Sequence, residues 1–279
     1  MRADRPSRTA QHNALFRAIE QRLPQPLFAD PWARRFLRGR YRLAALLPAA
    51  ALARAIDARW PGPRAAVCVR TRWIDDAICA AIARGLDQLV VLGAGFDARA
   101  HRLPGIARVR VFEVDHPATQ EMKRRVVGAA PAHVSYVPVV FGRDALPDAL
   151  ARAGLLPDTR TLLLWEGVTN YLDEPTVDAT LRFAAHAGQA LLFTYVDRAV
   201  IDGEKLFAGG PESVAHVKKL GEPFTFGFDP AELPAYLGAR GLELEQDLPL
   251  SEAARRYYPD DACPPVSAFY HVVSARCRA

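Results

Sequence analysis

The feature that most limits how this chain can fold is an apolar run that enters a turn bounded by two glycines. Residues 89–92 are leucine or valine, and Gly93 and Gly95 follow them directly. Such a run is typical of a parallel strand that is buried on both faces. The glycines allow the backbone to turn tightly and to approach a ligand, where a Cβ would clash. This stretch therefore predicts a nucleotide-type site after the first strand of a doubly wound sheet.

A second apolar run, over residues 111–115, ends in Asp115. An acid about 20 residues after the glycine turn is expected to bind ribose hydroxyls. Glu113 is the alternative acid in the same run. The dinucleotide pattern is incomplete, because Ala98 stands where a third glycine is required. The spacing therefore argues against NAD and favours a smaller nucleoside ligand.

Strands and helices alternate along the rest of the chain, which predicts one mostly parallel, Rossmann-like sheet with helices on both faces. The last two strands have only a short connection that contains proline, so we expect an antiparallel hairpin at the sheet edge. The expected strands are 88–92, 109–114, 134–139, 161–165, 190–196, 242–247 and 268–276. The expected helices are 11–23, 67–84, 117–128, 144–153, 175–187 and 230–240.

We interpret residues 1–279 as a single domain. Residues 11–60 are expected to form an N-terminal helical lid, and residues 85–279 the α/β core. Residues 197–229 contain five glycines and no clear helical period. A loop of this length is usually functional, so we expect it to act as a lid or substrate loop.

Composition and charge narrow the class of protein. Half of the 279 residues are hydrophobic, a quarter are charged and the net charge is +5. We interpret the basic residues as dispersed over solvated faces, so we expect no nucleic-acid partner. The apolar stretch 43–56 contains Pro48 and Arg54 and is too short to span a bilayer, so we expect a buried helical segment or lid and no membrane partner.

The cysteines and the N-terminus indicate a cytoplasmic protein without a metal site. The first residues are polar and lack an apolar signal core. No two cysteines have metal-ligand spacing, so we interpret all four as reduced structural thiols. They are Cys68, Cys79, Cys263 and Cys277.

Four motifs resemble those of the leucine carboxyl methyltransferase family, and most closely its bacterial branch of polyketide carboxyl methyltransferases of the tetracenomycin type. They are residues 70–76, 92–103, 112–117 and 165–172, and residues 222–227 resemble that branch as well. The resemblance implies the class I methyltransferase fold with an antiparallel last strand. It also implies S-adenosyl-L-methionine as the cofactor and a carboxyl or hydroxyl oxygen of a small molecule as the methyl acceptor, and we expect that molecule to be a carboxylic acid.

The resemblance implies roles for several residues. Arg70 would hold the carboxylate of the methionine moiety, which Gly93 and Gly95 would admit closely. Asp115 would bind the ribose hydroxyls. Glu166 would lie under the cofactor at the end of the fourth strand.

The chain departs from the family pattern after its third strand. Val140 stands where family members have an acid that contacts adenine. Phe141 is still expected to cover the adenine ring. Asp144, or a backbone group, is the candidate to supply the missing contact.

Several charged residues have a structural alternative. Arg70 and Arg72 lie two apart on one expected helix, so they point to different faces, and either could form a surface ion pair with Asp75 or Asp76. Asp97 and Arg99 could brace the glycine turn instead of binding a ligand.

Tyr171 lies on the same loop as Glu166 and is our candidate to contact the acceptor. Five other side chains are weaker pocket candidates, because packing explains each of them equally simply. They are Tyr195, His216, Tyr257, Tyr258 and His271.

Two kinds of acceptor remain open. A carboxylate is ionised at neutral pH and needs only groups that hold it, for which Arg70 and Tyr171 are the catalytic candidates. A phenol or enol would need a base to remove its proton, and His216 is the residue to test. Two alternatives from other classes are an NAD-dependent oxidoreductase and a non-catalytic nucleoside- or RNA-binding protein.

Overall fold

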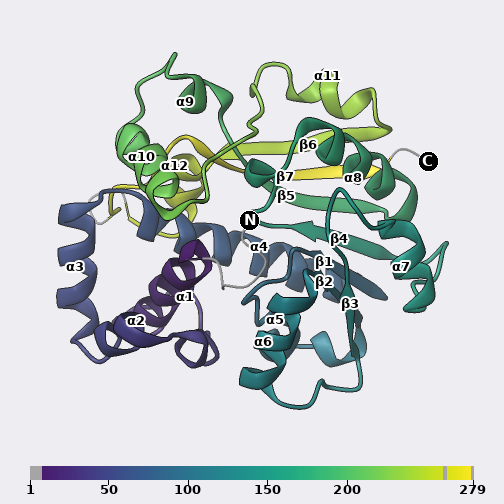
Figure 1. Cartoon of the computed structure of the whole chain (residues 1–279), viewed down its shortest axis with the longest axis horizontal. Helices are drawn as coiled ribbons and strands as arrows, with labels where there is room; N and C mark the ends of the chain where they lie inside the picture. The colour runs from purple at the N-terminus through teal and green to yellow at the C-terminus, as the bar shows by residue number, and fades with distance from the viewer. Residues whose placement is uncertain (1–7, 260–262, 278–279) are drawn as a thin grey trace.

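The computed structural model describes residues 8–259 and 263–277, which form one seven-stranded sheet flanked by helices (Figure 1). The strand order is β3-β2-β1-β4-β5-β7-β6. The strands are β1 (Gln88–Leu92), β2 (Arg110–Asp115), β3 (Val134–Pro138), β4 (Thr161–Trp165), β5 (Ala190–Val196), β6 (Leu242–Pro249) and β7 (Tyr270–Cys277). Every expected strand is present, with ends that differ by at most two residues.

The sheet is parallel from β3 to β5, and β7 runs antiparallel to both of its neighbours. The expected hairpin of the last two strands is confirmed, with β6 at the sheet edge. Because β1 lies in the middle of the parallel part, its side chains are buried on both faces: Leu89 and Val91 join one apolar core, and Val90 and Leu92 join the other.

The helices that follow the strands cover the two faces. One core includes α4 (Pro63–Ala83), α5 (Arg99–Arg102), the 3₁₀ turn η2 (Ile106–Arg108) and α12 (Leu250–Ala253). The other core includes α7 (Leu146–Arg152), α8 (Glu174–Ala187) and α11 (Leu233–Gly238). The helix α6 (Pro117–Val127) covers β2 and β3, and η4 (Ala254–Arg256) follows α12.

A lobe of N-terminal helices lies beside the sheet (Figure 1). It contains α1 (Arg8–Glu20), η1 (Ala33–Phe36), α2 (Gly39–Ala44) and α3 (Ala49–Arg59). Asp30 lies just before η1, and its Oδ1 accepts hydrogen bonds from the N–H groups of Trp32 and Ala33. The helix expected over residues 11–23 begins at Arg8 and ends at Glu20.

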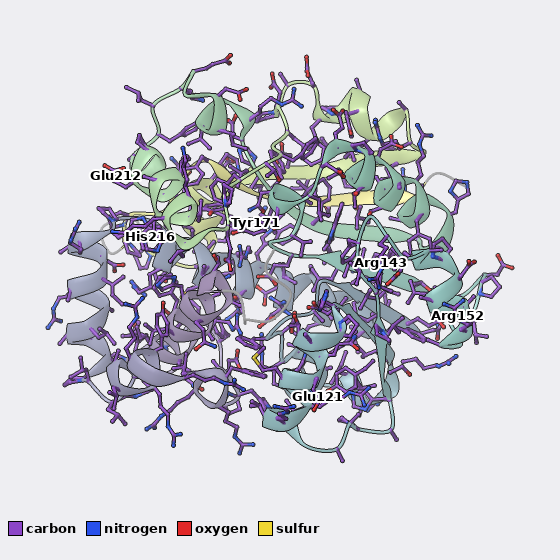
Figure 2. All side chains as sticks on the ribbon, in the orientation of Figure 1. Glu121, Arg143, Arg152, Tyr171, Glu212 and His216 are labelled. Carbon is purple, nitrogen blue, oxygen red and sulfur yellow. The ribbon has the colours of Figure 1, made fainter. Side chains whose placement is uncertain are left out.

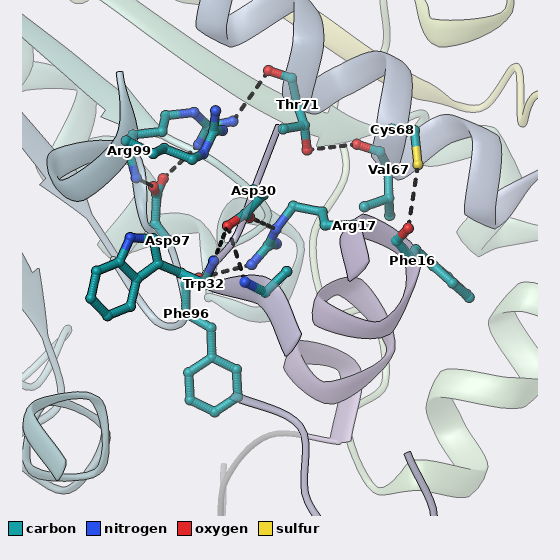
Figure 3. A network of polar contacts seen from close by, with 12 residues as sticks. Phe16, Arg17, Asp30, Trp32, Val67, Cys68, Thr71, Phe96, Asp97 and Arg99 are labelled. Carbon is teal, nitrogen blue, oxygen red and sulfur yellow. Dashed lines mark hydrogen bonds and ion pairs between the residues drawn. The ribbon is translucent and has the colours of Figure 1, made fainter. Parts of the chain in front are cut away.

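The lobe is fixed to the glycine turn by polar and aromatic contacts (Figure 3). Arg17 donates from Nη2 to the carbonyl of Phe96 at 2.8 Å and from Nε to Asp30 at 2.9 Å. The ring of Phe36 stacks on that of Phe96, with centroids 4.9 Å apart. The lobe therefore rests directly on the loop that follows β1.

Two expectations about local structure are wrong. The segment 197–229 is not wholly irregular, because it contains α9 (Arg198–Asp202) and α10 (Gly210–Leu220). Gly209 and Gly221 flank α10 in left-handed conformations, so these glycines mark helix ends. The stretch 43–56 is not wholly buried, because Leu43, Leu46 and Leu47 are exposed. Within the described ranges, no helix is long and apolar enough to cross a membrane.

Candidate functional site

The predicted cofactor residues meet at the carboxyl edge of the parallel strands. Gly93 and Gly95 follow β1, Asp115 ends β2 and Glu166 follows β4. The N–H groups of Gly95 and His116 donate to the two oxygens of Asp115 at 2.5 and 2.6 Å. Burial raises the pKa of Asp115, although these two donors favour its ionised form. The acid is therefore held against the glycine turn.

The conformation of the turn requires glycine. Gly93 and Gly95 have φ angles of +68° and +44°. A Cβ on Gly93 would lie 2.3 Å from the Cγ2 atom of Val168, so a larger residue would have to displace the Val168 side chain in the loop after β4. A Cβ on Gly95 would meet only ordinary contacts, the closest at 3.7 Å. The requirement for glycine thus comes from packing at Gly93 and from backbone conformation at both positions.

A chain of buried ion pairs lies behind this edge. Glu166 accepts from Arg70 Nε at 2.7 Å and from Arg99 Nη1 at 2.5 Å. Arg99 also binds Asp97 at 2.5 Å and Asp75 at 2.7 Å, and Figure 3 shows its contact with Asp97. Burial opposes ionisation here, but the arginine charges outweigh it: the pKa of Glu166 is lowered, and the pKa of Asp97 falls to about 2.

These contacts distinguish between the alternatives for the charged residues. Arg70 pairs with Glu166, so a surface ion pair with Asp75 or Asp76 is wrong for this residue. Arg72 does form that surface pair, with Asp76 at 2.8 Å. Asp97 and Arg99 bind each other beside the glycine turn, which is the bracing arrangement.

A cavity of about 50 Å³ lies between the lobe, α10 and the end of the sheet. Arg70 and Tyr171 line it from the sheet side, and His216 lines it from α10. Most other lining groups are apolar or carry a neutral hydroxyl or amide. Among the described lining residues, Arg70 is the only Asp, Glu, Lys or Arg. Within the same part of the chain, its terminal nitrogens make no hydrogen bond.

Two histidines face each other on the cavity wall. The rings of His12 and His216 lie 5.1 Å apart, and the ring of Trp60 lies 4.4 Å from that of His216. Burial lowers the pKa of His12 to about 4 and also lowers that of His216. Both imidazoles are therefore neutral at pH 7. The Nε2 atom of His216 is buried and has no hydrogen-bond partner among the described residues.

Tyr171 lies in the 3₁₀ turn η3 (Thr169–Tyr171) after β4, and Figure 2 labels it together with His216 of α10. Its ring packs 5.9 Å from that of Phe224. Burial raises the pKa of Tyr171 to about 12, so its hydroxyl stays protonated at neutral pH.

The residues predicted after β3 lie in the loop that leads to α7. Phe141 is half-buried against the apolar core that includes α7, α8 and α11. Asp144 accepts from the N–H of Val140 at 2.9 Å and pairs with Arg143, which lowers the pKa of Asp144. Asp144 is thus partly engaged by its own loop.

Four of the weaker pocket candidates lie outside the cavity. The hydroxyl of Tyr195 donates to Asp247 at 2.7 Å, and His271 lies 2.8 Å from the same carboxylate. This triangle joins β5, β6 and β7. Tyr257 donates to Asp76, and Tyr258 packs against the apolar core that includes α4, α5 and α12. Only His216 of the five lines the cavity.

Sequence reasoning missed several cavity residues. Asn170 belongs to the motif over residues 165–172, so its position in that motif could have identified it. His12, Trp60 and Tyr270 come from the two ends of the chain and had no local signal. The described residues contain no cluster of side chains suited to hold a metal ion.

Comparison with solved structures identifies the fold. The chain superposes on a protein from Thermobifida fusca YX that is provisionally named a methyltransferase, with a TM-score of 0.62, 15% identity and coverage of 96% of this chain and 94% of that one. A DUF574 family protein from Streptomyces avermitilis gives a TM-score of 0.61, 15% identity and 97% coverage of both. The sheet order and the glycine turn are those of the class I methyltransferase fold.

The family follows from sequence. The model of the leucine carboxyl methyltransferase family matches residues 10–185, and the chain belongs to this family. Three relatives are provisionally named S-adenosyl-L-methionine-dependent methyltransferases. That of Mycobacteroides abscessus is 33% identical over 77% of this chain and 66% of its own length. One from Frankia alni is 39% identical over 59% of this chain and 59% of its own length. One from Streptomyces coelicolor is 35% identical over 74% of this chain and 75% of its own length.

Proposed function

We propose that the chain is an S-adenosyl-L-methionine-dependent O-methyltransferase that forms a methyl ester on the carboxylate of a small molecule. The observation that carries the proposal is Arg70, the one Asp, Glu, Lys or Arg among the described residues that line the cavity. The Nε atom of Arg70 is bound by Glu166, which leaves its terminal nitrogens as donors for a carboxylate. Membership of a carboxyl methyltransferase family supports the same acceptor.

The residues around the glycine turn fit the cofactor by their chemistry. Asp115 uses one lone pair of each oxygen for backbone donors, so each oxygen can still accept from a ribose hydroxyl. Half-buried Phe141 offers an apolar face for adenine, with Asp144 in the same loop. Arg70 has two terminal nitrogens, of which one is our candidate donor to the methionine carboxylate and the other remains for the acceptor. When bound, S-adenosylmethionine supplies a methyl group that its sulfonium charge already activates.

The protein's own part is to position the acceptor and to exclude water. A carboxylate acceptor is already ionised, so no side chain has to remove a proton. Tyr171 keeps its proton at neutral pH and can donate it in a hydrogen bond to one acceptor oxygen. Arg70 adds a positive charge on the same wall. The second oxygen is then free to attack.

The cavity has to open before it can accept a ligand. Its volume is about 50 Å³, whereas sites for small molecules usually measure about 300–1,000 Å³. We assign the opening movement chiefly to residues 197–229, which include α10. The helices of residues 11–60 form the wall of the cavity that faces this lid.

A second candidate function is methylation of a phenol or enol hydroxyl. The observation in its favour is the neutral, unpartnered Nε2 of His216 in the cavity wall. A neutral imidazole there could accept the proton that such an acceptor must lose.

One experiment tests both candidates. Small carboxylic acids and phenols are incubated with the protein and S-adenosylmethionine that carries a labelled methyl group, and products are read by mass spectrometry. A labelled product that mild base cleaves is an ester and supports the proposal. A base-stable ether supports the second candidate, and no transfer to any acceptor contradicts both.

The pH dependence separates the candidates further. For a carboxylate acceptor the rate should stay nearly flat from about pH 6 to 9, because the acceptor is ionised throughout. His216→Ala should then leave the chemical step nearly unchanged. For a hydroxyl acceptor the same variant should lose about 10²–10⁴-fold in rate.

A further inference from the structure

The positive charge of the chain is concentrated in one segment. Residues 31–59 contain seven arginines, one aspartate and no other charged residue. This segment therefore carries a net charge of +6, and the remaining residues together carry −1. Its one acid, Asp57, is paired with Arg64 at 2.6 Å. The interpretation of dispersed basic residues is thus wrong: all seven arginines of the segment are exposed on the N-terminal lobe.

The same segment exposes leucines. Leu43, Leu46 and Leu47 are 67%, 59% and 52% exposed. They belong to α2 and to the turn that leads to α3, at a corner of the molecule away from the sheet (Figure 1). Three large apolar side chains are thus exposed within five residues of the chain, and exposed apolar surface that gathers in one place often marks an interaction site.

We propose that this corner is a peripheral docking surface for an anionic lipid bilayer. Exposed leucines on a short helix and its following turn, together with nearby arginines, are a combination that binds a lipid interface: the apolar side chains enter the headgroup boundary and the cations bind the phosphates. The contact lies on the membrane and does not span it. It is independent of the proposed reaction, and it replaces our expectation of no membrane partner with a surface contact.

Other partners use only part of this surface. A symmetric contact with a second copy would place two patches of +6 against each other, which electrostatic repulsion opposes. A nucleic acid would bind the arginines through its phosphates but would leave the leucines without a role. A lipid surface is the partner that accounts for both residue types.

Vesicle flotation tests the proposal with the full chain. Phosphatidylcholine vesicles are compared with vesicles that also contain phosphatidylglycerol, at low and at high salt. The first variant combines Arg38→Glu with Arg42→Glu, and the second combines Leu43→Ser, Leu46→Ser and Leu47→Ser. The matched control combines Arg152→Glu with Leu156→Ser, an exposed pair in and after α7 that lies across the molecule from α2; Figure 2 labels Arg152 there. Circular dichroism checks that each variant is folded.

The unaltered protein and the control should bind the anionic vesicles and be released at high salt. The arginine variant should bind at least ten times more weakly, since each basic residue near an anionic surface contributes about fivefold. The leucine variant should also bind about tenfold more weakly at low salt. Absence of binding by the unaltered protein, or unchanged binding by the leucine variant, overturns the proposal.

Discussion

Arg99 shows how one buried residue organises the site. Its guanidinium contacts three carboxylates, those of Asp75, Asp97 and Glu166. Arg70 and Arg102 supply the other two positive charges of the cluster, through Glu166 and Asp75. Three cations and three anions therefore balance in a region with little access to solvent. Such balance makes the burial of charge tolerable, and loss of one partner is costly.

We predict that Arg99→Met destabilises the fold by about 3–5 kcal/mol at pH 7, because it leaves buried carboxylates without a counter-charge. Urea unfolding measures the change. The control is Arg125→Met, whose ion pair with Glu121 is exposed on α6; its effect should stay within about 0.5 kcal/mol. Equal effects of the two variants would contradict a structural role for the buried cluster.

The buried ion pair between Asp97 and Arg99 predicts how the stability of the fold depends on pH. The folded-state pKa of Asp97 is about 2, below its ordinary value. The pair's contribution is therefore present above about pH 4 and is lost as the pH falls toward 2. In Arg99→Met the buried carboxylates lack their cation and protonate more readily. The difference in unfolding free energy between the two proteins should narrow as the pH falls from 7 to 4, and a constant difference would refute this account.

Asp115 provides the test of the cofactor assignment. Asp115→Ala should weaken binding of S-adenosylhomocysteine by about 1–3 kcal/mol, the range for loss of hydrogen bonds to a charged group. Isothermal titration calorimetry measures the affinity, and Asp148→Ala, an exposed acid on α7, is the control. Unchanged affinity in a folded Asp115→Ala protein would rule out the ribose assignment.

Sequence could predict the half of the site that follows the strands. The carboxyl ends of parallel strands meet at one edge, so Gly95 and Asp115 had to lie close together. The facing half could not be predicted in this way. His12 and His216 meet only because α1 and α10 pack over the same edge, and no local pattern reports that packing. The pairing of Arg70 with Glu166 could not be predicted for a related reason, because it depends on how α4 is rotated about its own axis relative to β4.

At the scale of elements, α1 and α10 differ in how firmly they are held. Arg17 of α1 binds Asp30 and the carbonyl of Phe96, next to the glycine turn. The contacts of α10 with the lobe include a hydrogen bond from Trp60 to Ser213 at 3.2 Å and the ring contact of His216. Glycines flank α10 at both ends. Glycines on both sides of a short segment are also typical of a loop, which is why the sequence did not predict this helix.

We predict that ligand binding protects α10 more than α1. Hydrogen exchange with S-adenosylhomocysteine and an accepted substrate should slow clearly in residues 210–220 and change little in residues 8–20. The reason is that locally unstable elements are the ones that open and close around a site. An equal change in both helices would contradict the assignment of the opening movement to residues 197–229.

The whole molecule joins its lobe and its sheet through one apolar core. Phe16, Leu27 and Phe28 of the lobe belong to the same buried cluster as Leu89 and Val91 of β1. Sequence reasoning could separate an N-terminal helical part from an α/β part, because their periodicities differ. It could not show that the two share a core, since that depends on side chains far apart along the chain.

We therefore predict that lobe and sheet unfold together in a single thermal transition, since separating them would expose the shared core. Saturating S-adenosylhomocysteine should raise that one midpoint by several degrees: a ligand at about 100 times its dissociation constant adds about 2.7 kcal/mol, and about 1 kcal/mol shifts the midpoint of a large domain by roughly 2–4 °C. Differential scanning calorimetry measures both effects. Phe96→Ala removes the ring that stacks on Phe36, and it should lower the same single midpoint. Two resolved transitions, with the ligand shifting only one of them, would show that the lobe folds independently of the sheet.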